Sequence, residues 1–164
     1  MQKSHSFFLD TYDSLKEEDI ETILFDLIPG DRVFLIWDLG SGKSTLARAM
    51  IRRHFSGPDM TVRSPTYTYY QRYSQSDRVR TDENIVFSPS YILPPPIYHF
   101  DLYRVESADD LHLIWVADIL DDPLSICIIE WPEILGDRVI PTRKISVRSA
   151  LSSWRIYDRE TLIV

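Results

Sequence analysis

The sequence predicts an α/β sandwich with a mainly parallel central sheet and antiparallel strands at its edges. Three observations support this fold class. A β-branched and aromatic run at 33–36 passes through a short glycine-containing turn into an amphipathic helix. Two later apolar runs, 97–102 and 124–129, have the composition of buried strands, and a helical pattern lies between them. Strands that alternate with helices in this way build parallel sheets, because each connection must return to the same end of the sheet.

Length and composition bound the class of protein. The 164 residues suit a single domain at 1–164, and the 44% hydrophobic and 26% charged residues are ordinary for a globular chain. A net charge of −7 argues against a free-standing nucleic-acid binder, which would need a basic face. Cys127 is the only cysteine, so a reducing compartment and a core role for it are expected. The N-terminus lacks the apolar core of a signal peptide and no run is long enough to span a bilayer, so we expect a cytoplasmic protein without a membrane partner.

Two elements are predicted before the first of these strands. The apolar run 6–9 is short enough for an edge strand. Ser14, with Glu17 three residues later, reads as a capping box that begins a helix. Pro29-Gly30 would end that helix, and its apolar residues fall on one face: Ile20, Ile23, Leu24, Leu27 and Ile28.

The helix after the glycine-containing turn is predicted from Leu46, Met50 and Ile51, which recur at helical spacing. It should reach residue 54 or 55 and stop at Gly57-Pro58. The segment 61–73 then reads as an extended, aromatic-rich stretch with a corner at its Ser-Pro pair.

The second half of the chain begins with a stretch of different amino-acid composition. Residues 74–96 are polar, then proline-rich, and are expected to form a loop insertion. Ser107 and Asp110 should cap a helix that ends at 121–123. Residues 144–148 and 155–157 should form a terminal pair of antiparallel strands.

The turn between the strand at 33–36 and the next helix has the features of a phosphate-binding loop. In such a loop the backbone N–H groups converge on the anion, a lysine reaches the β and γ phosphates, and a Ser or Thr hydroxyl binds Mg²⁺. Lys43 and Ser44 occupy those two positions. Trp37 replaces the first glycine of the pattern G-x-x-x-x-G-K-[ST], but the strand-loop-helix setting is the one that the motif requires. The predicted fold is therefore a P-loop NTPase-like sandwich.

Two acidic residues end apolar strands downstream of this loop. Asp101 ends Tyr98-His99-Phe100-Asp101, and Glu130 ends Ile128-Ile129-Glu130. Ligands of open α/β sheets bind at the carboxyl ends of strands, so both side chains should point at the nucleotide. One carboxylate would hold Mg²⁺ directly or through water, and another would orient the attacking water. The four histidines show no metal-ligand spacing and are expected to be structural or solvated.

Four motifs in one order resemble those of the TsaE family of bacterial ATPases. They are Asp38-Leu39-Gly40-Ser41-Gly42-Lys43-Ser44-Thr45, Ser64-Pro65-Thr66-Tyr67-Thr68, His99-Phe100-Asp101-Leu102-Tyr103-Arg104 and Ile129-Glu130-Trp131-Pro132-Glu133. The resemblance covers roughly residues 15–147 and leaves out the insertion at 74–96. It implies an ATPase with ATP and Mg²⁺ as cofactors, which works with the TsaB and TsaD proteins in threonylcarbamoyladenosine modification of tRNA. The tRNA itself would be reached only indirectly, through that complex.

The resemblance also assigns roles residue by residue. Thr66 looks like a switch residue that senses the γ-phosphate or the metal, and Asp101 and Glu130 would complete the metal and water site with Ser44. Because no arginine finger can be named, weak hydrolysis that rises with partners is expected. The phosphate cradle would consist of Gly40, Ser41, Gly42, Lys43, Ser44 and Thr45.

Three other readings compete with this one. A GTPase is disfavoured because its Asn-Lys-x-Asp motif is missing: the only asparagine, Asn84, is followed by Ile85. A small-molecule or nucleoside kinase is stronger, because Arg78 and Arg80 could act as a lid that clamps phosphates. The third reading is a nucleotide-dependent interaction module with incidental hydrolysis. Transfer of phosphate to a metabolite would identify the kinase.

Tryptophan stands at three positions where the resemblance predicts glycine. They are Trp37, Trp115 and Trp154, whereas Trp131 matches a tryptophan of the family. Glycine is scarce, with 5 residues in 164, against a usual share of about 7%. Ordinary divergence is one explanation. The hypothesis that we favour is that UGA codons, which some bacteria read as glycine, are written here as tryptophan.

Overall fold

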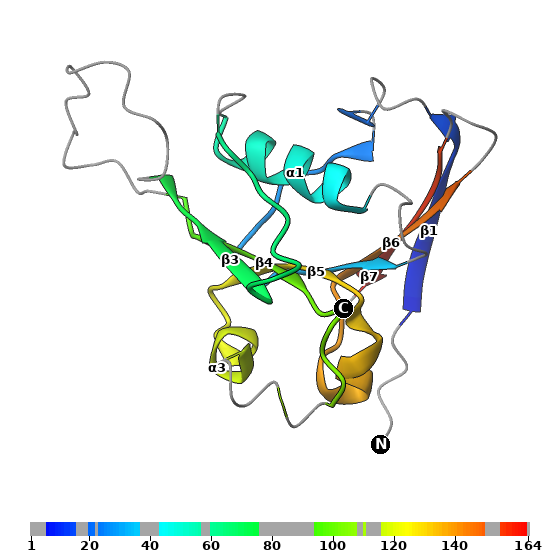
Figure 1. Cartoon of the computed structure of the whole chain (residues 1–164). Coiled ribbons are helices and arrows are strands. Elements are labelled where there is room, and N and C mark those ends of the chain that lie inside the picture. Colours follow the sequence, from blue (N-terminus) through cyan, green and yellow to red (C-terminus); the bar gives the residue numbers. More distant parts are fainter. Residues whose placement is uncertain are drawn as a thin grey trace, which may run out of the picture.

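The computed structural model describes residues 6–15, 20–21, 23–36, 43–56, 60–75, 94–107, 110, 116–149 and 155–163. Seven strands in these ranges form one sheet, in the order β1-β7-β6-β2-β5-β4-β3 (Figure 1). Their bounds are Ser6–Leu15 (β1), Arg32–Ile36 (β2), Tyr70–Tyr73 (β3), Ile97–Asp101 (β4), Ile126–Glu130 (β5), Arg143–Ser149 (β6) and Arg155–Ile163 (β7).

The centre of the sheet is parallel and its edges are antiparallel. Strand β2 pairs in parallel with both β5 and β6, and β4 pairs in parallel with β5. Strand β3 is antiparallel to β4 at one edge, while β7 is antiparallel to both β6 and β1 at the other. The predicted α/β fold with a mainly parallel centre and antiparallel edges is confirmed.

Helical segments cover both faces of the sheet. Helix α1 (Lys43–His54) lies on one face, and α3 (Val116–Asp121) and the 3-10 helix η3 (Pro132–Arg138) lie on the other (Figure 1). The alternation of β2 matches these layers. Leu35 packs in the core cluster that contains Met50 of α1, whereas Phe34 packs in the cluster that contains Val116 of α3. In the part of the chain that the structure describes, no helix is long and apolar enough to cross a membrane.

The predicted N-terminal helix is wrong. Strand β1 continues through Ser14 to Leu15, so Ser14 does not begin a helix. Its backbone pairs with β7 from Ser6 to Tyr12 and again at Leu15 opposite Arg155, with an irregularity between Tyr12 and Leu15. The segment from Leu24 to Pro29 is irregular, and only 3-10 geometry occurs at residues 20, 21 and 23.

The apolar residues of this segment are nevertheless largely buried. Ile20, Ile23, Leu24 and Leu27 join the cluster beneath α1, whereas Ile28 is 56% exposed. Burial of four of the five predicted positions shows why the pattern was misread. Irregular chain that packs on a helix can reproduce the spacing of an amphipathic face.

The remaining elements agree with expectation where they are described. Helix α1 ends at His54, and the terminal strands β6 and β7 are longer than predicted. The Ser107 N–H donates to Asp110 Oδ2 at 3.1 Å, as in the expected capping box. The predicted extended segment 61–73 is a strand only at β3, after a turn at 66–68. Most of the predicted insertion, residues 76–93, lies outside the described residues.

Candidate functional site

Three elements meet at the carboxyl edge of the parallel strands. Asp101 and Glu130 are register partners at the ends of β4 and β5, and α1 begins at Lys43 beside them. Side chains alternate along a strand, so His99 and Asp101 lie on the same face of β4 as Ile97, which packs beneath α1. The acidic strand ends therefore face the start of the helix, and this arrangement follows from register and alternation alone.

Glu130 is the central polar group of the site. Its side chain is buried, and an ionised carboxylate in such a position needs hydrogen-bond donors. Ser44 Oγ donates to Glu130 Oε2 at 3.0 Å, and His99 Nε2 lies 2.8 Å from Glu130 Oε1. Each carboxylate oxygen thus has a donor, one from α1 and one from β4.

Asp101 connects the same edge to the turn at 66–68. Thr66 Oγ1 donates to Asp101 Oδ2 at 2.6 Å, and the Tyr103 N–H donates to Asp101 Oδ1 at 3.1 Å. Ser64 Oγ lies 2.8 Å from Thr66 Oγ1 and extends the chain of hydroxyls. The segment around Thr66 is therefore held through its side chain to the end of β4.

Lys43 is buried at the start of α1 against an aromatic ring. Its Nζ lies 4.2 Å from the centroid of the Trp131 ring, a cation–π distance, and the Tyr103 and Trp131 rings are 5.0 Å apart. Trp131 has φ 59° and ψ 54°, a left-handed conformation that is uncommon for a bulky residue. This conformation turns the chain from β5 into η3, which begins at Pro132.

An exposed aromatic and basic pair flanks the turn at 66–68. Tyr67 is 81% exposed, and the Arg104 guanidinium lies 4.5 Å from the centroid of its ring. The turn thus contacts Asp101, the last residue of β4, through Thr66 and Arg104, three residues further on, through Tyr67.

The structure brings together five of the predicted site residues: Lys43, Ser44, Thr66, Asp101 and Glu130. Thr45 lies in the first turn of α1 and is half-buried. The predicted cradle residues Gly40, Ser41 and Gly42, with Trp37, lie outside the described residues, as do Trp115, Trp154, Arg78 and Arg80. Their predicted roles stay predictions.

Sequence reasoning missed two members of the site. His99 was expected to be structural or solvated, yet it contacts Glu130. The signal was available, because His99 lies two residues before Asp101 and so shares its face of the strand. The motif that contains Trp131 predicts no role for it, and only the left-handed turn after Glu130 puts its ring against Lys43.

The oxygen atoms at this edge fit a magnesium ion. No group of three or more His, Cys, Asp or Glu among the described residues could hold a metal alone. Mg²⁺, however, is bound by one or two carboxylates together with phosphate oxygens and water. Ser44 Oγ, Glu130 Oε2 and the neighbouring Asp101 supply hard oxygen donors of this kind. The donor set suits Mg²⁺ bound together with a nucleotide.

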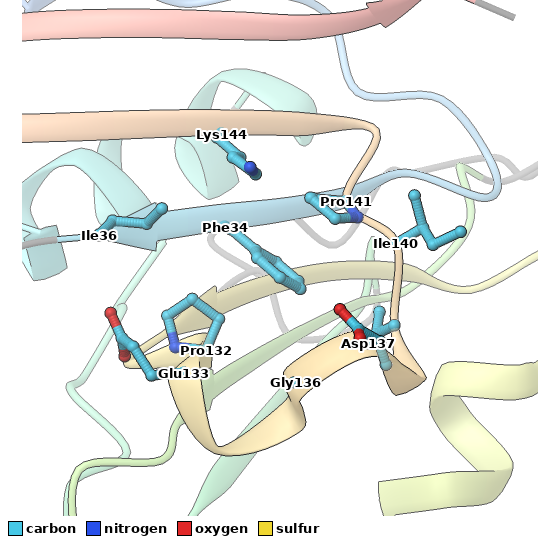
Figure 2. A pocket seen from close by; sticks show the side chains of 10 residues that line it. Phe34, Ile36, Pro132, Glu133, Gly136, Asp137, Ile140, Pro141 and Lys144 are labelled. Atoms are coloured by element: carbon cyan, nitrogen blue, oxygen red, sulfur yellow. The ribbon is translucent and has the colours of Figure 1, made fainter. Parts of the chain in front are cut away.

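A separate cavity of about 770 Å³ lies on the other face of the sheet. Figure 2 shows Phe34 of β2 directed toward η3, with Ile140 and Pro141 at one end of the cavity and Pro132 and Glu133 at the other. None of the five residues brought together above lines it. The cavity is therefore not the phosphate site, although Pro132 connects its wall to Trp131.

Comparison with known proteins gives a family match over most of the chain. Residues 12–159 match the model of the family described as "Threonylcarbamoyl adenosine biosynthesis protein TsaE". The chain is 35% identical over 115 residues to the tRNA threonylcarbamoyladenosine biosynthesis protein TsaE of Haemophilus influenzae, which covers 70% of this chain and 60% of that protein. It is 30% identical over 135 residues to the protein of the same name from Rickettsia typhi, covering 81% and 80%.

Two further observations limit what can be inferred about this chain from its relatives. The chain spans 60% and 56% of the lengths of its relatives from Haemophilus influenzae and Rickettsia felis, so it matches only part of each. The crystal structure of Bacillus subtilus YdiB superimposes with a TM-score of 0.57 at 18% identity, over 96% of this chain and 88% of that one. At that identity the superposition supports the fold alone.

Proposed function

The chain belongs to the TsaE family of threonylcarbamoyl adenosine biosynthesis proteins, and from this premise we propose that it is a Mg²⁺-dependent ATPase that supports threonylcarbamoyladenosine modification of tRNA together with TsaB and TsaD. One observation carries the proposal. The hydroxyl of Ser44, the last position of the phosphate-loop pattern and in the first turn of α1, donates to the strand-end carboxylate of Glu130 at 3.0 Å. A hydroxyl and a carboxylate in that relation are the protein ligands that a P-loop nucleotide site uses for Mg²⁺.

The roles of the site residues follow from their chemistry. Lys43 would neutralise charge on the β and γ phosphates, and to reach them its ammonium would leave the face of the Trp131 ring. Ser44, Asp101 and Glu130 would hold the metal, and a carboxylate among them would orient the attacking water. The bound Mg²⁺ would supply charge neutralisation between the β and γ phosphates.

Thr66 is proposed as the residue that reports the state of the nucleotide. Its hydroxyl donates to Oδ2 of Asp101 at 2.6 Å, so a ligand that recruits Oδ2 would compete with Thr66 for that oxygen. Loss of that bond would free the turn at 66–68 with its exposed Tyr67. A change of order in a surface segment is a common way for a nucleotide to control partner binding.

The proposed partners are proteins rather than tRNA alone. A net charge of −7 repels a phosphate backbone unless a basic face is present. We therefore place the tRNA on the TsaB and TsaD assembly, with this chain joining it in a nucleotide-dependent way. Coupling of hydrolysis to that assembly would keep the transfer reaction turning over.

Reconstitution with authentic TsaB, TsaD, tRNA and a preformed threonylcarbamoyl donor tests the proposal. Threonylcarbamoyladenosine should form over several turnovers with ATP, and fall to a single turnover or less without this chain or with a non-hydrolysable ATP analogue. Phosphate release should rise when the partners are added, and the chain should co-elute with them in at least one nucleotide state. Transfer of phosphate from ATP to a metabolite would instead establish the kinase, and absence of co-elution in every nucleotide state would count against the partners.

A further inference from the structure

His99 is a buried histidine at the site that the roles above leave unused. Only 1% of its side chain is exposed, and it lies on the α1 face of β4. The register pairs His99 with Ile128, two residues before Glu130 on β5. The His99 side chain therefore reaches diagonally from β4 to the Glu130 carboxylate at the end of the adjacent strand β5.

The contact between His99 and Glu130 has a defined direction. An ionised carboxylate accepts hydrogen bonds and cannot donate them, so at 2.8 Å the donor is the Nε2–H of His99. In a neutral ring, donation from Nε2 leaves Nδ1 without a proton. Nδ1 is buried and has no hydrogen-bond partner among the described residues.

The unpartnered Nδ1 distinguishes His99 from an ordinary core histidine. Buried polar atoms are nearly always paired, because an unpaired one costs free energy of folding. A histidine kept only for packing would be replaced by an apolar residue without that cost. The ring thus makes one polar contact in the described part of the chain, and that contact is to Glu130.

The two donors to Glu130 differ in what a metal would do to them. Ser44 Oγ and Glu130 Oε2 are both proposed metal ligands, so the hydrogen bond between them would be replaced by bonds to the ion. The bond from His99 to Oε1 involves neither of those atoms. The bond from His99 can persist in both the metal-free and the metal-bound site, and it can fix the rotation of the Glu130 carboxylate.

We propose that His99 is a positioning residue that donates its Nε2–H to Oε1 of Glu130 and so presents Oε2 to Ser44 and the metal. This inference rests on the proposed function for the identity of the ligand. Hydrogen-bonding partners that orient a metal ligand typically contribute roughly tenfold to a hundredfold in metal affinity or activity. Loss of the His99–Glu130 bond should therefore weaken Mg²⁺-dependent binding and hydrolysis and leave contacts to the nucleotide itself unchanged.

Three substitutions separate donation from packing. Glutamine at this position, His99→Gln, carries its amide N–H₂ about as far from the backbone as Nε2 of histidine and can keep the bond. Asparagine, His99→Asn, places its amide near the position of Nδ1 and falls short. Phenylalanine, His99→Phe, keeps a ring of similar shape and has no donor. His54→Gln, at the far end of α1, is the matched control.

Calorimetry of ATP binding and steady-state kinetics give the readouts. His99→Phe and His99→Asn should weaken ATP binding in Mg²⁺ by about tenfold or more, leave binding in EDTA unchanged, and lower kcat more than they raise KM. His99→Gln should recover most of both losses, and His54→Gln should match the parent. The proposal would be overturned if His99→Gln and His99→Phe lost ATP affinity and kcat equally. It would also be overturned if the variants lost as much ATP affinity in EDTA as in Mg²⁺.

Nitrogen NMR of the histidine rings provides a test that needs no nucleotide. The parent protein should show the His99 proton on Nε2, and its signal should shift in Glu130→Gln more than in a remote variant. A proton on Nδ1 with none on Nε2 would overturn the positioning role, even if His99→Phe fails to fold. If the protein binds no Mg-ATP while the Nε2–H signal is present, the proposed function fails and the His99–Glu130 bond stands.

Discussion

Replacement of Glu130 by glutamine or alanine separates the charge of this residue from its hydrogen bonds. Both variants remove the carboxylate that is proposed to hold the metal or orient water. Hydrolysis should fall about a hundredfold or more, which is roughly 2.7 kcal/mol in the barrier, and most of the ATP affinity should remain. If both variants release phosphate at the parental rate, the assignment of Glu130 is wrong.

The two variants should differ in stability, for a reason visible in the site. In Glu130→Gln the amide oxygen can accept from His99 Nε2, and the amide N–H₂ can donate to Ser44 Oγ, which as a hydroxyl also accepts. In Glu130→Ala the half-buried Ser44 hydroxyl can turn toward water, but His99 is 1% exposed and its Nε2–H stays unpaired.

An unsatisfied buried donor costs about 1–3 kcal/mol. Neither variant carries a charge at position 130, so the difference between their stabilities contains no contribution from desolvation of the carboxylate. Glu130→Ala should therefore melt below Glu130→Gln by about 2–12 °C in calorimetry, at the few degrees per kcal/mol usual for this size. Equal melting temperatures would refute the claim that His99 loses its hydrogen-bond acceptor only in Glu130→Ala, whatever the rates of hydrolysis.

Three other predictions concern the loop, its helix and its tryptophan. Lys43→Ala should weaken ATP binding by at least about tenfold, or 1.4 kcal/mol, because a charge-assisted contact to phosphate is lost; unchanged affinity in calorimetry would contradict this. Burial lowers the pKa of His54 from its ordinary value of 6.5, more than the bond to Pro95 raises it. The unfolded chain then binds the proton first, so the parent should lose stability relative to His54→Gln as pH falls below about 6.5 toward the folded pKa. A gain of stability of the parent relative to His54→Gln on acidification would contradict this. Trp37→Gly should bind ATP more tightly than the sequence as written, and UGA codons at 37, 115 and 154 with UGG at 131 would support decoding as glycine, whereas UGG at all four would eliminate it.

Local pattern was sufficient for the buried strands at the centre of the sheet and for the helix that follows the phosphate loop. Strands β2, β4 and β5 are near-continuous apolar runs because parallel strands are covered on both faces, and α1 repeats its apolar residues at helical spacing. The acidic ends of β4 and β5 could therefore be placed at one edge of the sheet from the sequence. Asp101 and Glu130 were predicted for this reason.

Tertiary pairing decided what local pattern could not. Ser14 carries a helix-capping signal, but β1 pairs with β7, at least 140 residues away, on both sides of it, at Tyr12 and at Leu15. The contact of His99 with Glu130 depends on the register between β4 and β5, and the contact of Lys43 with Trp131 depends on a left-handed residue at the end of β5. The sequence alone determined which acidic residues end β4 and β5. The identity of their partners was settled only by the order and register of the strands, because those bonds join segments that are distant along the chain.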